Sequence, residues 1–181
     1  SSAYTNRRLV GLPSEVRSYG RDSSGLDLVS KMTYGYDEEG FDQESNQNIT
    51  SVINHDNTNY SSSFVSGRGN LSSVTRWDVN HSSNSSYAVT SKTRYDVAGS
   101  VVAKLDPLNR KVSIDYTDNF NDTTTPRGTY AYPKTLTDPA GYSSTVKYRF
   151  DTGANVWAKS PDLNGSVSGK ETTRVYDDDT G

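Results

Sequence analysis

Hydrophobic and polar residues alternate one by one over several short stretches of this chain, which is the period of a half-buried β-strand. Gly, Pro, Asn or Asp bounds each stretch, as is typical of strands that end in turns. No hydrophobic stripe of helical period extends beyond a turn or two. The predicted strands are Lys31–Tyr36, Ser91–Tyr95, Ser100–Leu105, Lys111–Tyr116, Thr145–Phe150 and Asn155–Lys159.

Two kinds of turn signal alternate between these strands. One is an aromatic residue followed by Asp and then by Gly within three residues; the other is Asp-Pro followed by Gly or Asn. In both, the Asp side chain can accept from the backbone two residues on, and Gly or Asn supplies a positive φ. The first signal occurs at Tyr36-Asp37 with Gly40, Tyr95-Asp96 with Gly99 and Phe150-Asp151 with Gly153, and begins again at Tyr176-Asp177; the second occurs at Asp106-Pro107 with Asn109 and Asp138-Pro139 with Gly141.

The spacing of these signals is that of a repeat. One hairpin with its return, from Tyr95 to Tyr116, takes about 21 residues, inside the ~20–50-residue window that marks repeat architectures. We therefore interpret residues 1–181 as a single array of antiparallel β-hairpins that forms a curved or spiral sheet.

The regular pattern is interrupted twice. Residues from about 43 to 90 are rich in Asn and Ser, which favours loops, and two strands are expected within them, Ile49–Asn54 and Leu71–Val79. A second irregular stretch is Asn119–Gly128. We interpret both as insertions into the array and not as separate domains.

The alternation of the two turn signals along the chain resembles the repeat of the RHS, or YD-repeat, family. In that repeat, Tyr-Asp-x-x-Gly is followed by Asp-Pro-x-Gly and then by Tyr-x-Tyr-Asp. The resemblance covers about Leu26–Asp37 and Thr90–Gly181, with Asn109 in place of a turn Gly and Phe150 in place of Tyr. It implies a strip of hairpins that winds into a shell, as in teneurins and insecticidal toxin complexes. The family's cleavage core and toxin domain have no counterpart here, so no toxin activity follows.

Composition favours a thin sheet. Only 31% of the residues are hydrophobic and the mean hydropathy is -0.81, which is little for a thick two-layer core. The same composition is typical of disorder, but 13 Tyr, two Trp and four Phe suit a pleated, half-buried surface. A single twisted sheet, or a layer that needs a neighbour, is the expected form.

Charge and cysteine content exclude several partners. A net charge of -3 gives no electrostatic reason to bind nucleic acid. No apolar run approaches the ~20 residues of a membrane-spanning helix, so no membrane insertion is predicted. The sequence has no cysteine, which excludes disulfides and thiolate metal sites.

No residue constellation indicates catalysis, so we expect no enzyme, no cofactor and no metal. The two histidines, His55 and His81, lie in Asn- and Ser-rich stretches and lack the convergent partners of a triad or metal site. The acidic run Asp177–Asp179 could offer carboxylates to Ca²⁺ but lacks the alternating ligand spacing of an EF-hand loop. An acidic turn is the better interpretation.

The sequence holds seven Asn-x-Ser/Thr sites for N-glycosylation. Plain polar loops explain any one of them, yet seven is more than such a composition gives by chance. The Thr123–Thr125 cluster beside Pro126 could carry O-linked sugar. The candidate asparagines are Asn48, Asn59, Asn70, Asn80, Asn84, Asn121 and Asn164.

The sequence thus predicts a structural repeat segment of a large extracellular or cell-surface RHS-like protein. Its sheet edges would be open, so its expected partners are flanking repeats of a longer chain, or copies of itself in a glycosylated fibre. The alternative is a surface adhesin or carbohydrate-binding module, in which exposed Tyr and either Trp77 or Trp157 stack on surface glycans.

Overall fold

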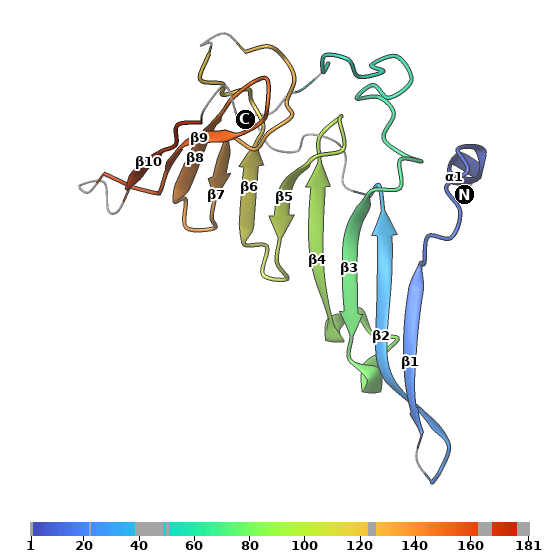
Figure 1. Cartoon of the computed structure of the whole chain (residues 1–181). Helices are drawn as coiled ribbons and strands as arrows, with labels where there is room; N and C mark the ends of the chain where they lie inside the picture. The colour runs from blue at the N-terminus through green and yellow to red at the C-terminus, as the bar shows by residue number, and fades with distance from the viewer. Residues whose placement is uncertain are drawn as a thin grey trace.

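The computed structural model describes residues 2–21, 23–38, 49, 51–122, 126–162 and 168–176 and shows one antiparallel β-sheet of ten strands. The strands lie side by side in chain order (Figure 1). A short helix, α1 (Ser2–Asn6), precedes them, and two short 3-10 turns lie between β3 and β4. The strands are β1 (Glu15–Arg21), β2 (Leu26–Tyr36), β3 (Leu71–Trp77), β4 (Ala88–Tyr95), β5 (Val101–Leu105), β6 (Lys111–Asp115), β7 (Thr135–Thr137), β8 (Ser143–Tyr148), β9 (Asn155–Lys159) and β10 (Glu171–Thr173).

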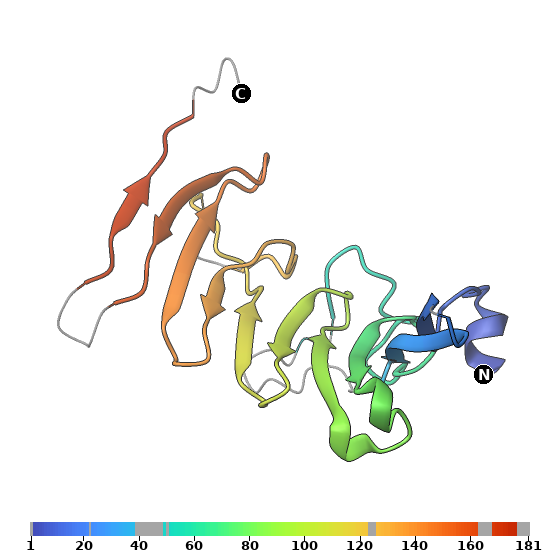
Figure 2. The ribbon, with the colours of Figure 1, turned by 90° about the horizontal axis from the view of Figure 1, so that it is seen from below.

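The sheet is a meander that curves along its length, which confirms the predicted all-β, antiparallel, curved architecture (Figure 2). Because the chain reverses direction at every connection, the connections fall into two sets at opposite ends of the sheet. We call one end the tyrosine end, because β2, β4 and β8 finish there at Tyr36, Tyr95 and Tyr148. The other end is called the far end.

A β-bulge precedes the tyrosine end in three hairpins. The strand register shifts between Gly35 and Tyr36, again just before Tyr95, and again just before Tyr148. A bulge leaves one extra residue on the partner strand, bends it and increases the local twist. Because a bulge recurs at the same position in three hairpins, the bulges contribute to the curvature of the sheet.

Buried hydrophobic residues lie in β5, at Val102 and Ala103, and in a cluster among the connections. The cluster of Ile49, Val52 and Val97, with Tyr130 packed against it, joins the β2–β3 connection, the β4–β5 turn and the β6–β7 connection. The Ile53 amide also donates to the Gly128 carbonyl at 2.8 Å. The two predicted insertions therefore pack on each other at the tyrosine end, while most strand residues stay half-buried.

The predicted strands are found, except one, although β2 begins at Leu26 and not at Lys31, and β4 at Ala88 and not at Ser91. The described residues of the stretch 49–54 form a loop, in which Ile49 and Val52 pack into the core cluster just described while Ile53 is exposed. Three strands were missed by the pattern: β1, β7 and β10. β7 and β10 have three residues each, too few to show a period of two.

Candidate functional site

The turns at Asp96, Asp106 and Asp138 share one hydrogen-bond pattern. In each, the Asp amide donates to the carbonyl four residues on, and the amide three residues on donates back to the Asp carbonyl. Oδ1 of each Asp accepts from the amide four residues on, at 2.8 to 2.9 Å. The residue three on has a positive φ in every case: 89° at Gly99, 58° at Asn109 and 89° at Gly141.

The two turn signals therefore build one kind of turn, and they differ in position and burial. Asp96 lies at the tyrosine end and is fully buried, whereas Asp138 lies at the far end and is exposed. Pro107 and Pro139 follow the two far-end aspartates, where proline presets φ for the turn. The predicted alternation of signals thus reflects the alternation of sheet ends.

Four tyrosine hydroxyls hold the hairpins closed at the tyrosine end. Tyr36, which ends β2, donates to the Pro13 carbonyl just before β1 at 3.1 Å, and Tyr95, which ends β4, donates to the carbonyl of the first residue of β3 at 2.9 Å. Tyr148 and Tyr176 follow the same rule, on the carbonyls of Pro133 and Asn155. Each hydroxyl therefore reaches back to the start of the preceding strand.

The third aromatic-Asp signal was placed two residues too late in the sequence analysis. Tyr148, and not Phe150, takes the place of Tyr95, because the bulge and the reaching hydroxyl both occur at Tyr148. The Arg149 amide makes the turn bond to the Ala154 carbonyl that the Asp amide makes elsewhere. Phe150 and Asp151 lie in the turn itself, which is one residue longer than the turn at Asp96.

The Asp37 carboxylate anchors the β2–β3 insertion. It accepts the backbone amides of Arg68, Gly69 and Asn70 at 2.9 to 3.0 Å, and the Asp37 amide donates to the Asn70 carbonyl at 2.9 Å. The Tyr4 hydroxyl of α1 donates to the same carboxylate at 2.8 Å. Burial and this hydrogen bond raise the pKa of Tyr4 to about 12. The insertion is therefore an enlarged form of the turn that the aromatic-Asp signal predicted.

Arg68 ties the insertion to the neighbouring turn. Its guanidinium donates to the carbonyls of Phe64 at 3.0 Å, Tyr60 at 2.6 Å and Val97 at 2.6 Å. Asp96 lies beside Val97 and has no exposed surface, and its Oδ2 has no hydrogen-bond partner among the described residues. Burial raises the pKa of the Asp96 carboxyl. Sequence reasoning gave Arg68 no role, because its partners are backbone carbonyls with no sequence signal.

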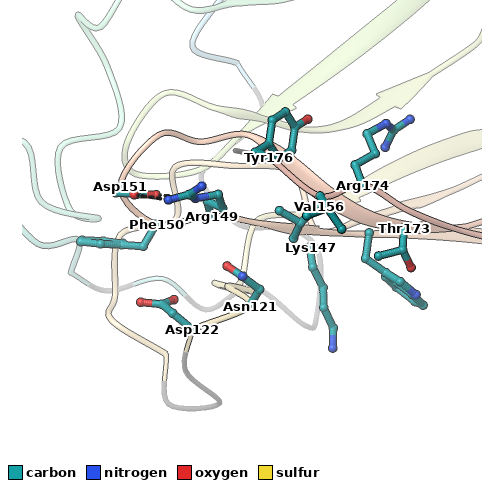
Figure 3. A pocket seen from close by; sticks show the side chains of 12 residues that line it. Asn121, Asp122, Lys147, Arg149, Phe150, Asp151, Val156, Thr173, Arg174 and Tyr176 are labelled. Carbon is teal, nitrogen blue, oxygen red and sulfur yellow. Dashed lines mark hydrogen bonds and ion pairs between the residues drawn. The ribbon is translucent and has the colours of Figure 1, made fainter. Parts of the chain in front are cut away.

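An open pocket of about 660 Å³ lies over the last hairpins (Figure 3). The β8–β9 turn contributes Arg149, Phe150 and Asp151, and β9 contributes Trp157. The Arg149 guanidinium donates two hydrogen bonds to Asp151, which lower the pKa of that carboxyl. Arg174, just after β10, lies on the opposite side of the pocket from this ion pair.

Aromatic rings are packed along this end of the sheet. The Phe150 ring has the Arg127 guanidinium over it at 3.8 Å and the edge of Phe120 at 5.2 Å. Tyr132 stacks on Tyr148 with ring centroids 5.0 Å apart. The strand-end tyrosines lie at least two strands apart, roughly 9–10 Å or more. That separation is too wide for ring contact, and their hydroxyls bond instead.

The candidate glycosylation sites differ in exposure. Asn59, Asn80, Asn84 and Asn121 are exposed, whereas Asn70 is half-buried. Asn84 caps a 3-10 turn by accepting from the Ser86 amide at 3.0 Å. Asn48 and Asn164 lie outside the described residues, as do Gly40, Asp177 and the acidic and Thr-rich runs named above.

No described group of three His, Asp or Glu side chains could hold a metal ion. Nδ1 of His55 lies 2.8 Å from Asn57 Oδ1. His81 pairs with Asp78 at 2.9 Å and stacks on Tyr87. Both are local loop contacts. Within the described part of the chain, no helix has the length and apolar character needed to cross a membrane.

The sequence matches no protein-family model and no curated protein.

Proposed function

We propose that this chain is a structural β-repeat segment of a large extracellular RHS-like protein, and that its sheet is extended at both edges. The observation that supports this most is the one-layer meander of ten strands, in which β1 and β10 each pair on one side only among the described residues. Free strand edges template further pairing. In a longer chain, flanking repeats would take these edges; in the isolated chain, copies would.

The backbone shows which amides each edge offers. The Tyr34 amide donates to the Ser14 carbonyl, so the amides of Glu15 and Arg17 face away from β2. On the other edge, the Arg174 amide donates to the Val156 carbonyl, so those of Glu171 and Thr173 face away from β9. Glu171 and Thr173 of β10 are therefore outward residues with the same spacing as Glu15 and Arg17 of β1.

The two edges complement each other in one register. Because the number of strands is even, β10 of one copy would run antiparallel to β1 of the next copy. Placing Glu171 opposite Arg17 and Thr173 opposite Glu15 pairs opposite charges, which stabilises a cross-strand pair. A shift by two residues in one direction would place Glu171 opposite Glu15 and oppose like charges, and a shift in the other direction would place it opposite Tyr19 and lose the charge pair. The contact is head-to-tail and so builds a strip or fibre.

Sedimentation velocity over a range of protein concentrations tests the proposal. We expect the mass of the particle to rise with concentration, and we expect Arg17→Pro to abolish the rise, because proline removes an outward amide while the β1–β2 ladder is kept. Arg17→Ala, which keeps the amide, serves as the matched control and should weaken association only in part. A protein that stays monomeric, or an Arg17→Pro variant that associates like the wild type, overturns the proposal.

The second candidate function, a surface adhesin or carbohydrate-binding module, is supported by one observation, the pocket beside Trp157. The two functions are compatible, because a structural strip can carry a ligand site. Extracellular location is proposed for both. The four exposed asparagines named above are consistent with a glycosylated surface.

A further inference from the structure

We propose that a second, smaller pocket at the tyrosine end binds a phosphate group, either as the free ion or as a monoester. The pocket has a volume of about 230 Å³, below the range of about 300–1,000 Å³ that is typical of sites for drug-sized molecules. It lies where the N-terminal segment, the β2–β3 insertion and the β4–β5 turn meet. The inference uses no part of the edge pairing of the sheet.

The first argument is a guanidinium group, that of Arg7, which is fixed in place without an acidic partner. Its central carbon lies 3.8 Å from the centroid of the Phe64 ring and 5.0 Å from that of Tyr60, which is a cation–π arrangement. Tyr4 holds the same segment in place through its 2.8 Å hydrogen bond to Asp37. In the contacts between described residues, the Arg7 side chain meets no carboxylate. Its five N–H donors are therefore available to a ligand.

The second argument is that Arg68 brings another guanidinium to the same two rings. Its central carbon lies 5.7 Å from the centroid of Tyr60 and 5.5 Å from that of Phe64. The backbone carbonyls named above hold this group in its orientation. Carbonyl groups are neutral, so these hydrogen bonds fix the guanidinium and leave its positive charge uncompensated.

The third argument is that the described lining of the pocket contains no acidic residue. Two aspartates lie near Arg68 and raise its pKa, against the larger effect of burial, which lowers it, as the charge of Arg7 also does. The carboxylate of one of them, Asp37, already accepts three backbone amides and the Tyr4 hydroxyl. The other, Asp96, is fully buried. A ligand in the pocket would therefore meet two guanidinium groups and no carboxylate.

This lining suits phosphate better than a carboxylate. A phosphate monoester carries a charge of about -1.5 to -2 at pH 7 and three acceptor oxygens, which matches two guanidinium groups. Arginine forms strong, often bidentate, hydrogen bonds with phosphate. The side chain of Asn70, which also lines the pocket, adds an amide donor. A bound phosphate would contact both arginines and so hold the N-terminal segment against the insertion.

Isothermal titration calorimetry tests the inference with three probes: inorganic phosphate, O-phosphoserine and acetate, all at one ionic strength. We expect saturable binding of at least one phosphate compound, with an affinity at least about tenfold above that of acetate, the worth of one charge-assisted hydrogen bond. Tighter binding of inorganic phosphate would identify the free ion as the ligand. Tighter binding of phosphoserine would identify a monoester, and both results support the site.

Matched variants assign the binding to this pocket. Arg7→Gln should weaken phosphate binding about tenfold or more, and Arg7→Lys, which keeps the charge, should weaken it less. Arg8→Gln is the control, because Arg8 is exposed and is not among the described residues that line the pocket. It removes the same charge one residue away and should bind like the wild type. Circular dichroism confirms that each variant is folded.

Chymotrypsin cleavage after Tyr60 and Phe64 gives a second readout, because phosphate should slow it in the wild type and in Arg8→Gln but not in Arg7→Gln. Absence of saturable binding of both phosphate compounds, equal affinity for acetate, or an Arg7→Gln variant that binds like Arg8→Gln overturns the inference. None of these results bears on edge pairing, because sedimentation measures that separately.

Discussion

The hydroxyl of Tyr95, at the end of β4, donates a 2.9 Å hydrogen bond to the carbonyl of Leu71, the first residue of β3. The two residues lie at the same end of one hairpin, where neighbouring strands would otherwise be free to separate. The same relationship joins Tyr148 to the Pro133 carbonyl at 2.8 Å. Its recurrence indicates that the aromatic residue of the repeat phrase closes a hairpin, while the Asp that follows turns the chain.

Replacing Tyr95 by Phe should remove this bond and keep the ring. The half-buried Leu71 carbonyl would lose its donor, so we expect the free energy of unfolding to fall by about 1 kcal/mol. Urea unfolding, followed by circular dichroism, measures the change. Tyr148→Phe should give a similar loss, because its hydroxyl has the same role.

Tyr142→Phe is the matched control, since Tyr142 lies in an exposed far-end turn. Its effect should stay within about 0.5 kcal/mol. Equal losses in all three variants would show that the recurring bond has no special part in stability.

Asp96→Asn should change the pH dependence of stability. Burial raises the pKa of the Asp96 carboxyl, so the unfolded chain releases this proton at a lower pH than the folded chain. The wild type therefore loses stability as pH rises from about 4 through the raised value. The variant lacks this loss, so its stability relative to the wild type should improve from pH 4 to pH 7 by an amount on the order of 1 kcal/mol.

Unfolding curves at pH 4, 5, 6 and 7 test this sign. Tyr95→Phe serves as the control, because a tyrosine hydroxyl does not titrate in this range. An Asp96→Asn variant whose relative stability is flat, or falls toward pH 7, contradicts the assignment of Asp96 as a buried carboxyl with a raised pKa.

Arg68→Lys should loosen the β2–β3 insertion and leave the sheet intact. Lysine cannot reproduce the planar fork that contacts the carbonyls of Tyr60, Phe64 and Val97. Chymotrypsin cleaves after Tyr60 and Phe64, so the rate of cleavage there reports local opening. We expect it to rise by about tenfold or more.

Arg110→Lys is the control for this measurement, because Arg110 makes an exposed ion pair with Asp106 at 2.6 Å. It should leave the cleavage pattern unchanged. If Arg68→Lys is cleaved no faster than Arg110→Lys, the carbonyl contacts of Arg68 do not hold the insertion.

Strands and turns could be predicted here because their signals are local. Alternation marks β5 and β9 directly, and a turn such as that at Asp138 depends on residues within five positions of each other. The role of Tyr148 could not be predicted from the same phrase. The role of Tyr148 is visible only from a bulge and from a hydroxyl group that reaches another strand. In the sequence, the nearby Phe150-Asp151 pair matched the aromatic-Asp turn signal better.

The insertion and the pocket could not be predicted for a related reason. Arg68 acts on carbonyls up to 29 positions away, and backbone carbonyls carry no sequence signal. Trp157 was named as a candidate for sugar stacking, but the other residues that line the pocket were not, because they come from distant parts of the chain, such as Asn121 from the β6–β7 connection and Arg174 from just after β10. Long-range contacts of this kind follow from topology.

Glycosylation should follow exposure. In a host that glycosylates secreted proteins, we expect peptides containing Asn80, Asn84 and Asn121 to gain mass, since these side chains are exposed. Asn70 should stay unmodified, because it is half-buried and its backbone is held against Asp37, whose carboxylate accepts the Asn70 backbone N–H at 3.0 Å. Peptide mass mapping measures each site, and full occupancy at Asn70 with none at Asn80 would contradict the placement of the insertion.

The measurement that tests the central claim most directly is cysteine cross-linking of the two sheet edges. The chain has no cysteine of its own. In the proposed register, Thr172 of one copy faces Val16 of the next copy in a non-hydrogen-bonded pair, with Cα atoms about 4.5 Å apart, within disulfide reach. The double variant Val16→Cys, Thr172→Cys should therefore form a ladder of covalent oligomers on mild oxidation, whereas each single variant should stay monomeric. A double variant that stays monomeric, or a Val16→Cys single variant that dimerises through paired β1 edges, would contradict head-to-tail extension of the sheet.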